Sequence, residues 1–561
     1  MCALVAALVY VPTLRYQLVW DDIDIIVQNQ SSPLAAFSHT FWHGGGAGTL
    51  GKDPYYRPLS NFSLGVDELV AGHRAWYFHM VNLLFHAAVV ALAGVVLWQV
   101  FNSSWLVLAG GMVCAVHPLA ADSVAYVSGR TDLLAGAGLL LALLGLLRLQ
   151  KRHDWPAVAL LWCGFATALL SKETAVMFVP LAGAFLWARG LKQMHRRDWV
   201  AAAGVLGLLG AYLAARYAVL GSVVGTVVSG NVAANVLLSL ANFGRLLLVA
   251  VLPLGQRVFM WSPAGFGRLA LLALPGILYL ALPLVLKPMR RWREAGFAWL
   301  WSVALLLPFA GLAGFGPGGR LLYVPGIGFV VLSLLAVRSV TQETRKGPVT
   351  AVAIVLGYSV LLALLVLPQR MGVWRDGYTL FQRMTRESPA YPAAHFNYAF
   401  ELRRRGDIDG AATEYRKAIA LDSSMALAYS NLGALLQSKG ELAEAERLYL
   451  KTIELRPGYA LAWNNLGIVR YKQGDGAGAV RAMRRAIELK LDDAGAIYNL
   501  GRIYQQAGMA DSAGALFERA YRLEPDNPQI RGSYNQTHGG QPQLQGRPDR
   551  VEQHRNSSVD K

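Results

Sequence analysis

Apolar stretches about as long as a bilayer is thick recur before residue 370 of this 561-residue chain. A helix needs about 20 apolar residues to cross the hydrocarbon core, and backbone polar groups in lipid must pair within helices or closed barrels. The stretches therefore predict a bundle of transmembrane helices. They cover residues 76–101, 105–117, 124–149, 155–170, 174–188, 199–220, 235–252, 269–286, 296–312, 321–337 and 349–367.

Composition supports a membrane protein and excludes several classes of site. Hydrophobic residues make up 54% of the chain and charged residues 16%, whereas a soluble domain carries about 25% charged residues. The formal net charge of +17 does not predict nucleic-acid binding, because many Lys and Arg residues lie in short loops between apolar runs. Cys2, Cys114 and Cys163 lie in apolar surroundings, so neither a disulfide framework nor a CxxC metal site is expected.

The basic loops predict the orientation, because short loops rich in Lys and Arg face the cytoplasm. These loops are Arg148–Arg152, Arg189–Arg197, Lys287–Arg293 and Arg338–Lys346. All four can be cytoplasmic only if one of the two apolar runs after Arg197 does not cross. We expect Asn235–Leu252 to be re-entrant or interfacial, because polar residues interrupt it. The prediction is eleven crossings, a cytoplasmic N-terminus and an outer C-terminal part, with residues 1–14 forming a first helix whose start is clipped.

The C-terminal part repeats every 34 residues. Three ladders keep this step: Asn397, Asn431, Asn465 and Asn499; Gly406, Gly440, Gly474 and Gly508; and Ala411, Ala445, Ala479 and Ala513. The run Trp463-Asn464-Asn465-Leu466-Gly467 matches the W-x2-L-G core of a tetratricopeptide repeat. Residues 391–526 are therefore predicted to form four helix pairs that stack into a solenoid with a concave groove.

The predicted fold class is all-α: a polytopic transmembrane helical domain followed by a tetratricopeptide-repeat α-solenoid. The membrane domain covers residues 1–370 and includes a long first outer loop at 15–75. A linker helix is expected at 371–390. The tail at 527–561 is rich in Gly, Gln, Asn and Arg without an apolar period, so it is predicted to be disordered.

An acidic cluster, Trp20-Asp21-Asp22-Ile23-Asp24, follows the first apolar segment. Charges at a membrane edge are costly and indicate a functional site, although these acids could also simply begin a solvated loop. Other polar residues are predicted on the same outer face, in four separate loops. They are Arg57, His117, Asp122, Arg130, Asp132, Lys172, Glu173 and Arg320.

These residue types fit a lipid-linked phosphate substrate. Guanidinium groups pair bidentately with phosphate oxygens, and a carboxylate can act as a general base towards a hydroxyl group. Adjacent carboxylates could also hold a divalent cation, although no cofactor is required. No zinc-like spacing and no Walker or GxGxxG loop occurs, so a soluble nucleotide-sugar or ATP site is not expected.

Each candidate also has a purely structural interpretation. Arg130 and Asp132 could pair with charges on neighbouring helices, and Lys172 with Glu173 could be a charge pair at a helix end. Arg320 could be an interfacial anchor. His117, which precedes Pro118, is typical of a helix end. These alternatives stay open at the level of the sequence.

Several motifs resemble the transmembrane and tetratricopeptide-repeat O-mannosyltransferases, relatives of the protein O-mannosyltransferases with the GT-C membrane fold. The motifs are Trp20-Asp21-Asp22, Tyr56-Arg57-Pro58-Leu59, His117-Pro118, Gly129-Arg130-Thr131-Asp132-Leu133-Leu134-Ala135, Lys172-Glu173 and Arg320-Leu321-Leu322-Tyr323-Val324-Pro325. The resemblance implies inverting transfer of a sugar, mannose, from a polyprenyl-phosphate donor to a protein hydroxyl group. The chain departs from the family in its short first helix and its array of only four repeats.

The resemblance places the family's acidic pair on Asp21 and Asp22, one of which would be the base. Consecutive residues of an extended segment point in opposite directions, so only one of them should face the acceptor, and we favour Asp21.

The Asn ladder has its own interpretation. Asn431, Asn465 and Asn499 could grip an extended peptide backbone, because an amide side chain both donates and accepts hydrogen bonds. Alternatively, each Asn bonds a neighbouring helix and holds the stack together.

Two other classes of function remain as alternatives. One is a non-catalytic membrane scaffold that displays a peptide-binding solenoid. The other, a transporter, would place charges near the midplane, whereas these lie at span ends. The expected location is a bacterial inner membrane, with a sugar lipid and a protein or peptide as partners and no nucleic acid.

Overall fold

The computed structural model describes residues 1–20, 22, 56–188, 190, 193–221, 232–251, 253, 259–260, 266–283, 292–310, 316–317, 319–341 and 347–537. Within them the chain is almost wholly helical, and the only strands described are β1 (Phe259–Met260) and β2 (Gly316–Pro317). These pair antiparallel, with Phe259 opposite Pro317. The predicted all-α class is therefore confirmed. The chain divides into two compact units, one at Met1–Ala394 and one from His395 onwards.

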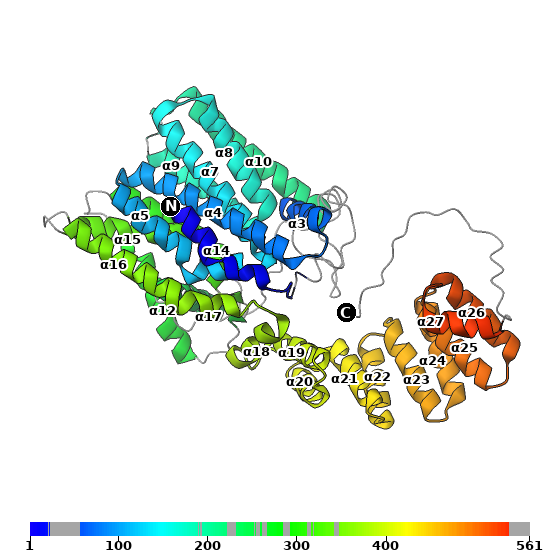
Figure 1. Ribbon diagram of the computed structural model, residues 1–561. Coiled ribbons are helices and arrows are strands. Elements are labelled where there is room, and N and C mark those ends of the chain that lie inside the picture. Colours follow the sequence, from blue (N-terminus) through cyan, green and yellow to red (C-terminus); the bar gives the residue numbers. More distant parts are fainter. Residues whose placement is uncertain are drawn as a thin grey trace. The chain divides into compact units, whose positions relative to one another are not determined.

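The first unit is a helical bundle (Figure 1). In order, its long helices are α1 (Cys2–Val9), α3 (Pro58–Ala71), α4 (Ala75–Phe101), α5 (Ser104–Val116), α7 (Arg130–Arg152), α8 (Trp155–Ser171), α9 (Phe178–Ala188), α10 (Arg196–Leu220), α11 (Val232–Val251), α12 (Phe266–Leu280), α14 (Trp292–Ala310), α15 (Gly326–Thr341) and α16 (Gly347–Leu361). Its short segments are η1 (Val11–Arg15), η3 (Pro118–Ala120), α6 (Ala121–Val124), η4 (Val127–Gly129), η5 (Glu173–Met177), η7 (Gly319–Leu322) and the π-helical turn η8 (Leu362–Val366). The helices α17 (Leu367–Gly372) and α18 (Gly377–Glu387) end the unit.

Helices that could cross a membrane occupy much of this unit. Four described helices are long and apolar enough: Ala75–Phe101, Val127–Arg152, Arg196–Leu220 and Val352–Gly372. The bent pair Ser104–Val116 and Pro118–Val124 makes a fifth if it is counted as one span, and seven shorter apolar helices accompany them. The protein is thus a multi-pass membrane protein. The count of eleven crossings and the re-entrant course of Asn235–Leu252 stay predictions.

Helices α7 and α8 pack closely through glycines. A Cβ added to Gly138 would lie 2.6 Å from the carbonyl oxygen of Gly164, and one added to Gly164 would meet the backbone nitrogen of Ala142. Small residues allow membrane helices to approach this closely. The pairing matters for function, because α7 begins with Arg130 and α8 ends just before Lys172.

Gly164→Leu is expected to force α7 and α8 apart and to destabilise the protein by about 1–3 kcal/mol, the usual cost of overpacking. Thermal unfolding in detergent measures this loss. Gly183→Leu is the matched control, because a Cβ at Gly183 meets no atom within 4 Å. Equal melting temperatures for the two variants would contradict the close packing.

The structure adds detail to two sequence predictions in this unit. The predicted outer loop at 15–75 contains the helix α3, which buries Leu64 and Asp67 on one side. The span predicted at residues 124–149 corresponds to the apolar helix Val127–Arg152, and the short segments η3 and α6 precede it. Both elements escape a hydropathy pattern because they are short or of mixed polarity.

The second unit is a stack of helix pairs, coloured yellow to red in Figure 1. The pairs are α19 (Pro392–Arg404) with α20 (Ile408–Leu421), α21 (Ala426–Ser438) with α22 (Leu442–Leu455), α23 (Ala460–Lys472) with α24 (Gly476–Leu489), and α25 (Ala494–Gln506) with α26 (Ala510–Leu523). The glycine ladder sits in the turns inside the pairs, at φ between 77° and 90°. Glycine adopts this left-handed conformation without a steric penalty.

The tail at 527–561 was predicted to be disordered, but its first part is helical. Residues Pro528–Thr537 form a further helix, α27, whose Ile530 and Tyr534 are buried. The ring of Tyr534 stacks on Tyr521 of α26 at 4.5 Å. A solenoid needs a final element to cover its last apolar face. Helix α27 does this with two buried residues that lie four apart, Ile530 and Tyr534.

Candidate functional site

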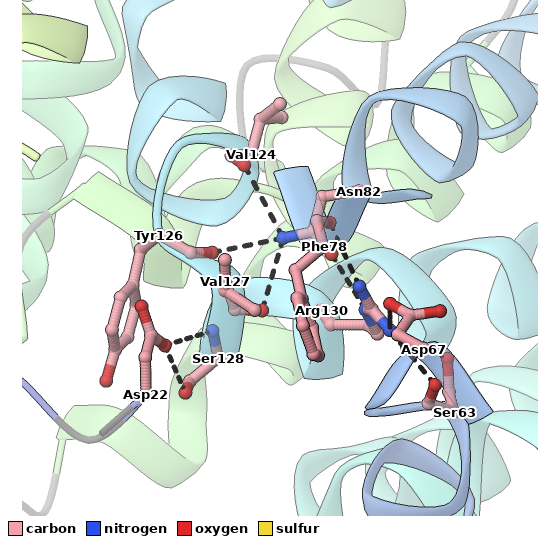
Figure 2. A network of polar contacts seen from close by, with 10 residues as sticks. All are labelled: Asp22, Ser63, Asp67, Phe78, Asn82, Val124, Tyr126, Val127, Ser128 and Arg130. Atoms are coloured by element: carbon pink, nitrogen blue, oxygen red, sulfur yellow. Dashed lines mark hydrogen bonds and ion pairs between the residues drawn. The ribbon is translucent and has the colours of Figure 1, made fainter. Parts of the chain in front are cut away.

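The acidic segment is anchored to the loop that precedes α7. Trp20 has a left-handed backbone conformation (φ 55°), which is uncommon for a non-glycine residue and is often found at functional sites. The buried carboxylate of Asp22 accepts hydrogen bonds from the Ser128 backbone N–H (2.8 Å) and the Ser128 hydroxyl group (2.6 Å) (Figure 2). It also accepts one from the Val19 N–H (3.2 Å). Outside the described residues lie Asp21 and Asp24.

Arg130 is completely buried, and every nitrogen of its guanidinium group has a partner (Figure 2). It donates to the Asn82 side chain (2.8 Å), to the carbonyl and hydroxyl oxygens of Ser63 (3.2 and 3.1 Å) and to the Phe78 carbonyl (3.0 Å). It also forms an ion pair with Asp67 at 2.5 Å. Burial raises the pKa of Asp67, and the charge of Arg130 opposes that shift. This geometry matches the pairing alternative for Arg130, and its role as a phosphate ligand stays a prediction.

Asn82 connects this network to the loop that holds Asp22. Its side-chain NH2 group donates to the carbonyl groups of Tyr126 (3.2 Å) and Val127 (3.1 Å). The sequence analysis missed Asn82, which lies in the long apolar helix α4. The available signal was its spacing from His79 and His86, because residues three and four apart share one helix face and polar residues inside a span are usually functional.

Three cations from separate segments gather near one another. Arg57 forms a bidentate pair with Glu173 at 2.9 and 2.7 Å, and Lys172 forms an ion pair with Asp132. The charges of Arg57 and Arg320 both act on the Lys172 ammonium group. We call Arg57, Lys172 and Arg320 the cationic cluster. These three residues are among those predicted to converge from separate loops, and convergence of the whole predicted set stays a prediction.

Arg320 differs from the other two cations in the cluster. Its guanidinium group lies over the ring of Tyr126 at 5.7 Å. Within the described parts of the chain, no carboxylate pairs with Arg320, whereas Arg57, Arg130 and Lys172 each have one. Among the described residues, the cluster therefore holds three cations against the two acids Asp132 and Glu173, a difference of one positive charge.

Tyr126 joins the cationic cluster to the acidic segment and to the end of the last apolar helix. Its ring lies against Trp20 at 6.3 Å and stacks on Trp374 at 4.7 Å. The indole N–H of Trp374 donates to Asp122 (2.9 Å), and Arg370 pairs with the same carboxylate at 2.5 Å. Asp122 is thereby fully engaged in the fold. The sequence analysis missed Arg370 and Trp374, because it ended the last span at residue 367.

A cavity of about 620 Å³ lies beside this region. Helices α4, α5, α15 and α16 contribute most of its lining, which is predominantly apolar. Leu322 and Tyr323, two and three residues after Arg320, also line it. His117 lies at its wall, where its Nδ1 accepts a hydrogen bond from the Leu119 N–H (3.3 Å) and caps η3. This matches the helix-end interpretation of His117.

The Asn ladder of the repeats makes contacts within the stack. Asn431 donates to the Tyr415 hydroxyl group (3.3 Å), and Asn499 donates to Asn464 of the preceding repeat (3.1 Å). Asn465 accepts a hydrogen bond from the side chain of its neighbour Asn464 (3.5 Å). These contacts match the alternative in which the amides hold the stack, and peptide binding by them stays a prediction.

Comparisons with known proteins point to one family. Protein O-mannosyl-transferase Tmtc2 of Drosophila melanogaster is 34% identical over 221 residues, which are 37% of this chain and 24% of that protein. Longer matches are found with protein O-mannosyl-transferase F38B6.6 of Caenorhabditis elegans, 25% identical over 440 residues (74% and 61% of the two chains), and with TMTC4 of Mus musculus, 27% identical over 481 residues (71% and 63%). The chain is thus similar in sequence to these protein O-mannosyl-transferases. This confirms the resemblance seen in the motifs.

The chain spans less than two thirds of the length of these mannosyl-transferase relatives. Family models for tetratricopeptide repeats match residues 401–440, 424–492 and 464–528, which confirms the predicted repeats. Among solved structures, the crystal structure of MamA protein is 26% identical over 27% of this chain and 81% of that chain, with a TM-score of 0.25.

A metal ion is not indicated by the part of the chain that the structure describes. In that part, no group of three or more His, Cys, Asp or Glu side chains could hold one. The possible divalent cation predicted at the acidic segment concerns Asp21 and Asp24 as well as Asp22, so it stays a prediction.

Proposed function

We propose that the protein is a membrane glycosyltransferase that moves a sugar, mannose, from a polyprenyl-phosphate donor to a hydroxyl group of a protein. The observation that carries this proposal is Arg320, a cation without a carboxylate partner among the described residues. It lies beside an apolar cavity and over the tyrosine against which the acidic segment packs.

The donor would bind in two parts. Its prenyl chain would fill the apolar cavity. A volume of about 620 Å³ and a lining with few polar groups are suited to a lipid. Its phosphate group would bind at the cationic cluster, where a phosphodiester would neutralise the excess positive charge. Arg320 is the natural first ligand, because a guanidinium group pairs with two phosphate oxygens at once.

Asp21 is the carboxylate we assign as general base. Asp22 already accepts three hydrogen bonds, from Ser128 and Val19, so it is committed to fixing the segment. The resemblance places the base on one of these two adjacent acids, which leaves Asp21 for that role.

The reaction would be a single displacement. The acceptor oxygen attacks the anomeric carbon and forms the new glycosidic bond, while the bond from that carbon to the phosphate oxygen breaks. The phosphate oxygen takes the electron pair and leaves as polyprenyl phosphate. Asp21 takes the proton of the acceptor hydroxyl group, and the configuration at the anomeric carbon is inverted.

We further propose that this site faces the outside of a bacterial inner membrane, as the basic loops indicate. The repeats would then lie on the same side and would bind the acceptor protein or a partner. This supports a reaction on proteins after they have crossed the membrane.

The direct test is transfer by the purified full-length protein. It is incubated with polyprenyl-phosphate mannose, polyprenyl-phosphate glucose and a peptide mixture rich in Ser and Thr, and mass spectrometry measures the mass added to the peptides. A mass increase of one hexose with the mannosyl donor supports the proposal. No transfer from either donor, by protein that remains folded, overturns it.

Arg320→Gln is expected to lower kcat/KM for the lipid donor by about 10- to 100-fold, because a hydrogen bond to a charged group contributes about 1.5–3 kcal/mol. Arg320→Lys should recover part of the loss, since it keeps the charge but not the bidentate geometry. The control is Arg15→Gln, an exposed arginine of the same unit. Unchanged donor kinetics in Arg320→Gln would show that Arg320 does not bind the phosphate.

The repeats favour one alternative, a non-catalytic membrane scaffold for protein binding. The four stacked helix pairs and their family matches support a binding surface whether or not the membrane unit is catalytic. Folded protein that binds a partner but transfers no sugar would favour the scaffold.

A further inference from the structure

A cavity of about 520 Å³ lies between the third and fourth repeats. It opens between the end of α23, the first half of α24 and the end of α25. Its main lining residues are Tyr471, Gly476, Val480, Arg484, Tyr504 and Met509. Because the repeats are 34 residues long, the equivalent positions between the first and second repeats and between the second and third repeats can be compared with this cavity. We call each boundary between successive repeats a junction.

The first difference between the junctions is a missing apolar side chain. The position two residues after the turn glycine is Ile408 in the first repeat and Leu442 in the second. Both side chains are half-buried. The third repeat has Gly476 there. A Cβ added to Gly476 would meet no atom within 4 Å, so the space that a branched apolar side chain would occupy is open.

The second difference is a missing ion pair. At the junction of the second and third repeats, Arg470 pairs with Glu446 at 2.8 Å. The residues 34 positions later are Tyr504 and Val480, and both line the cavity. The junction of the third and fourth repeats therefore lacks the salt bridge that helps to fill the equivalent place one repeat earlier.

The first junction shows the same contrast at a neighbouring position. There Lys439 pairs with Asp409. The equivalent residues between the third and fourth repeats are Ala507 and Ala477, which also line the cavity. Thus small or apolar residues replace both members of each pair, and the cavity follows from these replacements.

Arg484 is the one charged side chain among the residues that line the cavity. Helix α24 exposes Arg481, Arg484 and Arg485, and of these Arg485 pairs with Glu488 at 2.9 Å. Arg484 donates only to the neutral Tyr504 hydroxyl group at 2.8 Å. In the part of the chain that the structure describes, neither Arg481 nor Arg484 has a carboxylate partner. A carboxylate would be a stronger acceptor for Arg484 than tyrosine is.

We propose that this cavity is a docking site for a partner peptide that presents a large apolar side chain beside one or more carboxylates. The apolar side chain would occupy the space left by Gly476, and a carboxylate would reach Arg484. Burial of one large apolar side chain stabilises binding, and a charge-assisted hydrogen bond adds specificity. The site does not depend on sugar transfer, and it does not use the Asn ladder.

A displayed library of random dodecapeptides, selected on the immobilised full-length protein, tests the proposal. We expect enriched peptides to share a Leu, Ile, Phe or Met next to Asp or Glu. Gly476→Leu restores the side chain that Leu442 supplies in the preceding repeat, and it should weaken binding of the enriched peptides at least tenfold without lowering the melting temperature. Arg484→Gln should reduce binding only of the acidic peptides.

Ala510→Leu is the matched control, because it adds the same side chain at the equivalent position of the next repeat, outside the cavity lining. It should leave peptide binding unchanged. The proposal is overturned if no peptide is enriched, if the enriched peptides lack the apolar and acidic pair, or if they bind Gly476→Leu as well as the unaltered protein. Self-association of the protein that Gly476→Leu abolishes, without peptide binding, would also overturn it, since the occupant would then be a second copy.

Discussion

Replacing Asp21 with Asn is expected to remove sugar transfer while the protein stays folded. Asn has the same shape as Asp but cannot take a proton, and general-base catalysis contributes about 10²- to 10⁴-fold to a rate. The rate of hexose addition from polyprenyl-phosphate mannose, measured by mass spectrometry at saturating donor, should fall by this factor. The donor Kd should change little, because Asp21 acts on the acceptor.

Two substitutions in the same segment serve as controls. Asp22→Asn keeps an oxygen that can accept the Ser128 hydrogen bonds (2.8 and 2.6 Å), so a smaller loss of rate is expected. Asp24→Asn tests whether any acid in the segment has the same effect. Full activity of a protein that carries both Asp21→Asn and Asp22→Asn would rule out the proposed base.

Asp67→Ala is expected to cause the largest loss of stability in the membrane unit. It leaves the fully buried Arg130 without its carboxylate at 2.5 Å, and breaking a buried ion pair on one side costs about 3–5 kcal/mol. The unfolding temperature in detergent should fall sharply. Transfer should also be lost, because the Arg130 and Asn82 network supports the loop that holds Asp22 (Figure 2).

The matched control is Glu68→Ala, a neighbouring acid on α3 that is less buried, and it should change the unfolding temperature little. The double variant Asp67→Ala/Arg130→Met should recover part of the lost stability, because no unpaired charge remains buried. If the double variant is no more stable than Asp67→Ala, the uncompensated charge of Arg130 is not the cause of the loss.

The repeats are the part of the fold that the sequence predicted best. Each turn between paired helices needs a residue in a left-handed conformation, and Gly406, Gly440, Gly474 and Gly508 all have φ between 77° and 90°. Contacts in a solenoid connect neighbouring units, so a local pattern is enough to specify them. The sequence analysis did not predict the capping helix α27, because this helix occurs once and its sequence therefore shows no period.

The candidate site was predicted less completely. The cations Arg57, Lys172 and Arg320 stood out, because charges at the ends of apolar spans are rare. The partners that fix the site, such as Asn82 and Trp374, lie inside or just after apolar helices and carry no local signal of their contacts. Which cation has a carboxylate partner depends on helix packing, and Arg57 meets Glu173 across 116 residues of chain.

The sequence by itself determined the membrane helices, the four repeats and the family resemblance, because apolar length, a fixed period and short motifs are local properties of the chain. Only the tertiary structure decided which of the described charges have a carboxylate partner and which do not. Arg130 and Arg320 look alike as two arginines at span ends, yet the first is enclosed by α3 and α4, whereas the second has no carboxylate partner in the described chain. That difference arises from side chains brought together over long sequence separations, and no local pattern encodes it.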